Sequence, residues 1–142
     1  MSDAQLRDRA AHVGTRLRED VERFADNLDD DFVEHEAAPG IEPTKPGTKQ
    51  LFKLMMAGFP DLPFDAEDVL GSGDKVAMRV RITGTHKGEF MRIPASGKNT
   101  NVQGIDIVRF GDNGLAREHW GVMDVLSVMQ QIGAIPQGSP RS

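Results

Sequence analysis

The spacing of the apolar residues changes once along this chain of 142 residues, and that change limits the folds open to it. In the first part, apolar residues recur every three or four positions from Leu6 to Leu28. This spacing predicts one long amphipathic helix between Asp3 and Leu28, because 3.6 residues make one helical turn. After Pro63 the apolar residues alternate with polar ones, which is typical of strands with one buried face. The chain should therefore pack helices against a sheet.

The strands are expected in the second half of the chain. Alternation predicts strands over residues 76–82, 102–110 and 115–122. The last two are separated only by the turn residues 111–114, which include two glycines, an aspartate and an asparagine. Strands joined by so short a turn run antiparallel.

Shorter helices are marked by caps and breakers. A helix is expected over 48–58, because Gly58 and Pro60 stop it, and residues 32–36 are compatible with one further helical turn. Asp124 is placed to cap a last helix. Helices first and hairpin-linked strands afterwards favour an α+β fold, with a curved antiparallel sheet wrapped around the long N-terminal helix. We expect residues 1–142 to form a single domain.

Charge and composition exclude several partners and kinds of site. The net charge is −5, and the basic residues do not cluster, so we expect neither nucleic acid nor an anionic membrane as a partner. No segment approaches the roughly 20 apolar residues that span a bilayer. The absence of cysteine excludes disulfides and thiol chemistry and fits a reducing compartment, so we expect a cytoplasmic location.

Two histidines are candidates for acid/base chemistry. His86 has the parity of the apolar residues in the strand before it, so it faces the interior if that strand extends far enough. Alternatively, it lies in a turn and bonds a backbone carbonyl. His119 and Gly121 share one face of the last strand, and Trp120 lies on the other. Trp120 is either a packing anchor or an aromatic wall for a flat ligand.

Asp106 interrupts an otherwise apolar strand, where an unpaired carboxylate would be costly to bury. It faces either solvent or a polar pocket. In a pocket, burial would make it a stronger base, and His86 or His119 could orient it. His35 lies between two glutamates, and His12 belongs to the surface of the first helix.

No metal or cofactor is expected from these residues. The four histidines lack the His-x-His or His-x-x-x-His spacing of common metal sites. The chain also has no glycine-rich phosphate loop and no GxSxG motif. The chemistry that remains is acid/base catalysis without a cofactor.

Short motifs follow one another in a defined order: GTHKGEF at 84–90, IPASGK at 93–98, GIDIVRF at 104–110 and EHW at 118–120. In order and spacing they resemble the SnoaL-like polyketide cyclase family, which has the nuclear-transport-factor-2-like (NTF2-like) fold. The resemblance covers nearly the whole chain. It implies a cone-shaped α+β barrel, a homodimer, and a hydrophobic cavity for a small polyketide-like ligand.

The resemblance also implies a mechanism. Cyclases of this family use an aspartate to take the proton next to an ester carbonyl, close a ring by aldol condensation, and return the proton to the new alkoxide, without a metal. Here that aspartate falls on Gly121, which cannot move a proton. An assisting histidine falls on Asp106, while His86 and His119 match the family. We therefore expect Asp106, His86 and His119 to be the catalytic residues.

The ligand is expected to contact Trp120, Gly121, His35, Met78 and Met123, since methionines suit an adaptable apolar wall. Three interpretations remain open. The site is rewired around Asp106 as base, or the protein binds a small molecule without transforming it, or it is similar to limonene-epoxide hydrolases. The two arginines of the strand at 76–82 fit the last interpretation poorly, because an acid is needed where the second arginine stands.

Overall fold

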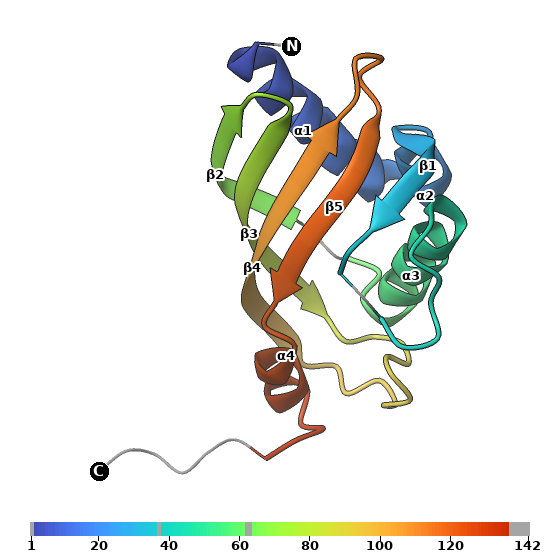
Figure 1. Cartoon of the computed structure of the whole chain (residues 1–142). Helices are drawn as coiled ribbons and strands as arrows, with labels where there is room; N and C mark the ends of the chain where they lie inside the picture. The colour runs from blue at the N-terminus through green and yellow to red at the C-terminus, as the bar shows by residue number, and fades with distance from the viewer. Residues whose placement is uncertain (1, 37, 62–63, 137–142) are drawn as a thin grey trace.

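A computed structural model describes residues 2–36, 38–61 and 64–136. Its centre is a curved sheet in the order β1-β5-β4-β3-β2 (Figure 1). The strands are β1 (Leu28–Glu34), β2 (Phe64–Ser72), β3 (Lys75–Thr85), β4 (Asn99–Phe110) and β5 (Ala116–Met123). β2 to β5 are antiparallel, whereas β1 pairs in parallel with β5. The predicted curved sheet is confirmed, and it is open and mixed rather than purely antiparallel.

In the described part of the chain, four helices accompany the sheet: α1 (Asp3–Glu19), α2 (Val21–Ala25), α3 (Lys45–Gly58) and α4 (Val125–Gln131). The prediction of one helix reaching Leu28 is wrong. Asp20 has an extended backbone and its carboxylate accepts a hydrogen bond from the Glu22 N–H at 2.8 Å, so a new helix starts there. The side chains of Val13 and Leu17 in the predicted stripe lie outside those described.

The segment at 32–36 is also not helical, because residues 32–34 complete β1 and Glu36 lies in a bend just after it. The other local predictions are confirmed. The predicted turn at 111–114 lies in the connection from β4 to β5, which extends over residues 111–115, and α3 ends at Gly58. Asp124 caps α4, because its carboxylate accepts hydrogen bonds from the N–H and hydroxyl of Ser127.

The apolar core occupies the inner, concave face of the sheet in two clusters. One joins α1 and α2 to the sheet through residues such as Leu6, Phe24 and Val76. The other gathers Phe59, Val102 and further residues near α4. Met78 and Phe64 are half-buried and pack against both clusters. Within the described residues, no helix is long and apolar enough to cross a membrane.

Candidate functional site

The inner face carries one row of residues across three strands. Met78 of β3 pairs with Asp106 of β4, and Asp106 pairs with Gly121 of β5. Residues that pair directly across strands point to the same face, so Asp106 lies on the inner face with Met78. Its side chain is 23% exposed and contacts His119. The alternative that Asp106 points into solvent is therefore wrong.

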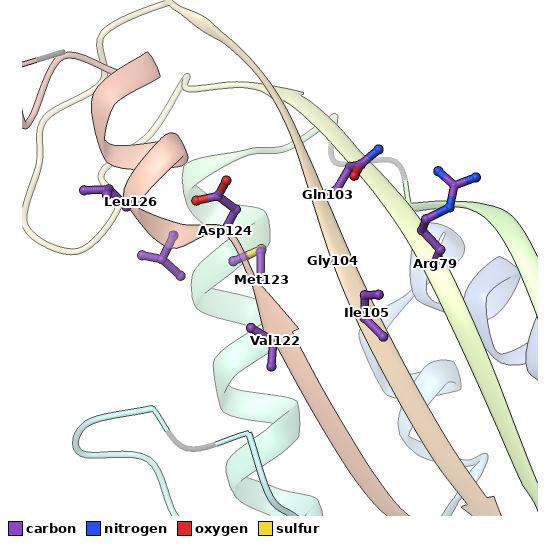
Figure 2. A pocket seen from close by; sticks show the side chains of 9 residues that line it. Arg79, Gln103, Gly104, Ile105, Val122, Met123, Asp124 and Leu126 are labelled. Atoms are coloured by element: carbon purple, nitrogen blue, oxygen red, sulfur yellow. The ribbon is translucent and has the colours of Figure 1, made fainter. Parts of the chain in front are cut away.

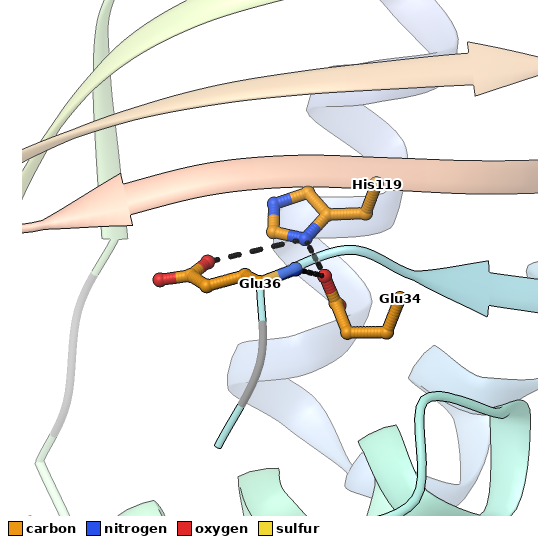
Figure 3. A group of neighbouring side chains, drawn as sticks. All are labelled: Glu34, Glu36 and His119. Carbon is orange, nitrogen blue, oxygen red and sulfur yellow. Dashed lines mark hydrogen bonds and ion pairs between the residues drawn. The ribbon is translucent and has the colours of Figure 1, made fainter.

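His119 lies between the carboxylates of Glu34 and Asp106, and Figure 3 shows the contact with Glu34. Its Nε2 lies 2.7 Å from Asp106 Oδ1, and its Nδ1 lies 2.6 Å from Glu34 Oε1. Glu34 is buried at the end of β1, and the same oxygen accepts the backbone N–H of Glu36 at 2.9 Å. The imidazole of His119 on β5 therefore links β1 to β4, two strands that are far apart in sequence.

The two carboxylates keep His119 protonated. Burial alone would lower the pKa of His119, but the hydrogen bonds to Asp106 and Glu34 outweigh burial and raise the pKa to about 10. Both ring nitrogens then donate, one to each carboxylate. At neutral pH, His119 is a fixed cation that orients its partners.

The free energy of unfolding should therefore fall as the pH rises. A folded-state pKa raised from 6.5 to about 10 contributes stability that is complete below pH 6.5 and lost as the pH passes through about 10. Across this window the slope should approach about 1.4 kcal/mol per pH unit. Urea denaturation at several pH values measures it. A flat profile, or a His119 ring that titrates near 6.5 by NMR, would contradict this assignment.

Glu36 adds a third carboxylate to this group. Its side chain is 34% exposed, and its Oε2 lies 4.0 Å from His119 Nδ1 (Figure 3). Burial raises the pKa of Glu36, and the charges of Asp106 and Glu34 add to this, while His119 opposes it. A Cβ placed on Gly121 would overlap Glu36 Oε2 and come within 2.6 Å of Asp106 Oδ1. Glycine at 121 therefore makes room for the carboxylates.

Sequence comparison identifies the family of this fold. A model of the SnoaL-like polyketide cyclases matches residues 9–132. The chain belongs to this family. A comparison with curated proteins found no match.

Solved structures support the NTF2-like fold of this SnoaL-like protein. TsrD from Streptomyces laurentii has a TM-score of 0.82 at 26% identity, covering 95% of this chain and 99% of its own. IdmH from Streptomyces antibioticus, a proposed polyketide cyclase, has a TM-score of 0.79 at 27% identity, covering 91% and 99%. AclR from Streptomyces galilaeus, a proposed hydroxylase, has a TM-score of 0.86 at 24% identity, covering 97% and 87%, and shows the shared fold alone.

His86 does not join the His119 group in this SnoaL-like chain. It is fully buried on the inner face, as its parity predicts, and stacks on Phe59 with ring centroids 5.4 Å apart. Ser96 donates its backbone N–H to His86 Nδ1, and the buried Nε2 has no hydrogen-bond partner among the described residues. Eight residues separate it from Met78, or roughly 26 Å along an extended strand. It therefore cannot orient Asp106.

Trp120 and His35 lie on the outer face, opposite the His119 group. Trp120 pairs with Ile107, which alternates with Asp106. Its ring stacks on His35 with centroids 4.8 Å apart, and His35 Nε2 lies 2.8 Å from Glu118 Oε2. The two residues do not line a pocket with Asp106, and Trp120 does not anchor the core. Strand alternation sends neighbouring side chains to opposite faces, so Trp120 cannot share a pocket with Asp106, and contact of Trp120 or His35 with a ligand stays a prediction.

A hollow of about 580 Å³ lies on this outer face, beside the start of α4 (Figure 2). Its lining is mostly apolar and includes Ile105 and Val122, which are 55% and 75% exposed. By contrast, an inner cavity next to Met123 and Phe59 measures only about 20 Å³. Ligand pockets usually hold roughly 300–1,000 Å³, so a ligand on the inner face would have to displace flexible side chains such as Met123.

Within the described residues, one group has the spacing of a cation site: one ligand atom from each of Glu34, Glu36 and His119 lies within 4.8 Å of the others. The contact between His119 and Glu34 is, however, a short hydrogen bond. A proton on Nδ1 accounts for it, and a cation would have to displace that proton. The expectation of chemistry without a metal stays a prediction.

The sequence interpretation missed Glu34 and Glu36. Their place beside His35 suggested a solvated helix end, whereas Glu34 ends a strand and Glu36 lies in the bend after it. The sequence offered no alternation here, because Phe32 and Val33 are both apolar, and only the structure shows that Phe32 and Glu34 are buried while Val33 is 40% exposed. Continuing this alternation of burial places Glu36 on the inner face as well.

Proposed function

We propose that this protein is an acid/base enzyme, a cyclase or isomerase, that acts on a hydrophobic polyketide-like small molecule without a cofactor. The observation that supports the proposal is the group of three carboxylates around one protonated imidazole, Glu34, Glu36, Asp106 and His119, on the inner face of a SnoaL-like fold. Carboxylates accept protons, and a fixed cation stabilises the negative charge of an enolate.

The surroundings suit such a substrate. Met78 and Met123 are half-buried on the same face, next to two methionines of α3 that pack against the core clusters, Met55 and Met56. Methionine side chains adapt to irregular apolar shapes. Met91 does not belong to this wall, because it is 57% exposed on the segment between β3 and β4. By displacing these methionines, a flat apolar molecule could reach the partly exposed carboxylates of Asp106 and Glu36.

An epoxide-hydrolase-like mechanism has less support. Such a mechanism needs an arginine and aspartates that activate water. Arg79 and Arg81 instead lie among the partly exposed residues of the outer face, where both bind Glu67 and Arg79 also binds Asp68. Arg79 pairs with Ile105, which is an outer-face neighbour of Asp106, so the arginines and the His119 group lie on opposite faces of the sheet.

The proposed function can be tested with an aromatic methyl ester that carries an enolisable α carbon and a tethered aldehyde. In D₂O, the protein should accelerate deuterium exchange at the α carbon and ring closure, both followed by NMR, and a chelator should not reduce either rate. Tight binding without exchange at any pH would favour a non-catalytic binding protein. Loss of activity with the chelator, restored by a metal, would overturn the metal-free mechanism.

We also propose a homodimer that forms through the outer face. Val122, Ile105 and Leu126 are all more than half exposed around the hollow. Apolar side chains gathered on one face mark interaction sites. A second copy offers the same apolar surface, so the two faces could cover each other about a twofold axis.

A further inference from the structure

We propose that Glu36 is the base that removes the α proton of the substrate, a role that rests on the proposed function above. The same carboxylate then returns the proton to the product. Residue 36, just after the end of β1, would thus supply the group that Gly121 cannot supply from β5.

Hydrogen bonding separates Glu36 from the other two carboxylates. Glu34 Oε1 already accepts from both His119 and the backbone of Glu36. Asp106 Oδ1 accepts from His119 Nε2 at 2.7 Å. The described residues donate no hydrogen bond to the Glu36 carboxylate, whose nearest cationic atom in an ion pair is 4.0 Å away. Glu36 is the carboxylate of the group with its oxygens available to a substrate.

The missing side chain of Gly121 leaves the space in which the Glu36 carboxylate lies. Any side chain at 121 would begin in the space that Glu36 Oε2 now fills, because a Cβ there would overlap it. That space adjoins Asp106 Oδ1 and His119 Cε1, at 2.6 and 2.8 Å from the same point. The base therefore lies directly beside the positive imidazolium, which can stabilise the enolate as it forms.

The reaction balances without another reactant. Glu36 takes the proton, and the C–H electron pair becomes the enolate. The enolate carbon attacks the tethered carbonyl carbon, a C–C bond forms, and the carbonyl oxygen becomes an alkoxide. The alkoxide takes the proton back from Glu36. Burial raises the pKa of Glu36 above the ordinary 4.5, in the direction that strengthens a general base.

Glu36→Gln is the direct test, with deuterium exchange at the α carbon as the readout. A general base typically contributes a factor of 10² to 10⁴, so exchange should fall at least about 100-fold. Glu42→Gln, an exposed glutamate in the same connection to α3, is the matched control and should keep the wild-type rate. The melting temperature of Glu36→Gln should not fall, because a raised pKa means that the folded state disfavours the ionised carboxylate.

A relocated base gives a second test. In the double variant Glu36→Ala and Gly121→Asp, the new carboxylate would grow into the emptied space. Exchange should recover at least about 10-fold over Glu36→Ala alone, and the acidic limb of the pH–rate profile should shift. A merely structural role for Glu36 would not produce this recovery.

The outcomes separate the two proposals. If the wild-type protein shows no exchange, the proposed function fails, and the assignment of Glu36 fails with it. If the wild type is active and Glu36→Gln stays active, only the assignment of Glu36 is overturned. An inactive Asp106→Asn beside an active Glu36→Gln would move the base to Asp106.

Discussion

Replacing His119 with asparagine is expected to lower the free energy of unfolding by about 3 to 5 kcal/mol, the usual cost of removing one partner from a buried ion pair. The imidazolium is 18% exposed and holds Glu34, itself buried, and Asp106. Without it, three carboxylates would face one another with no cation between them. Urea denaturation at pH 7 measures the loss.

His35 provides the matched control for this experiment. It also binds a glutamate, Glu118, at 2.8 Å, but on the outer face, where its side chain is 37% exposed. An exposed ion pair contributes at most about 1 kcal/mol, so His35→Asn should have a small effect. The deficit of His119→Asn should shrink near pH 4, where the carboxylates take up protons. Equal losses for the two variants, or a deficit that does not depend on pH, would contradict the buried-cation interpretation.

Replacing Val122 with aspartate is expected to convert a dimer into a monomer. Val122 is 75% exposed in a single chain, so the substitution should leave the fold and its melting behaviour nearly unchanged. In a twofold dimer it would bring two carboxylates into an apolar contact, at a cost of several kcal/mol. Sedimentation should show a mass near 15.6 kDa for the variant and about twice that for the wild type.

Leu54→Asp is the control, because Leu54 is 54% exposed but lies on α3, away from the outer face. It should leave the mass of the dimer unchanged. A wild-type protein that sediments as a monomer at high concentration, or a Val122→Asp variant that stays dimeric, would rule out this interface.

The sequence predicted the elements whose signals are local. The alternation in β3 and β4, the turn between β4 and β5 and the cap at Asp124 all depend on neighbouring residues, and all are confirmed. β1 was missed because its run of three aspartates is poor in strand-forming residues. Its strand conformation comes from parallel pairing with β5, across more than 80 residues. Such long-range pairing leaves no local pattern.

Only the part of the candidate site that depends on local alternation was predicted. Asp106 pairs with Gly121, two residues from His119 on the same strand, so parity places Asp106 and His119 on one face of adjacent strands. Glu34 and Glu36 reach His119 only because β1 lies beside β5. His86 has the predicted parity, but parity does not report distance along a strand, and the structure places it far from Asp106. Alternation thus identifies a shared face but does not define a site.

The acidic composition of β1 and β2 has a consequence for how this chain meets its copies. These two strands form the open edges of the sheet, with Asp29–Asp31 on one and Asp65, Glu67 and Asp68 on the other. Neighbouring strands lie about 4.8 Å apart, so copies that joined edge to edge would bring charged side chains into the new ladder and disturb the ion pairs that Glu67 and Asp68 make with Arg79 and Arg81. Sheet extension into fibres is thereby opposed at both ends.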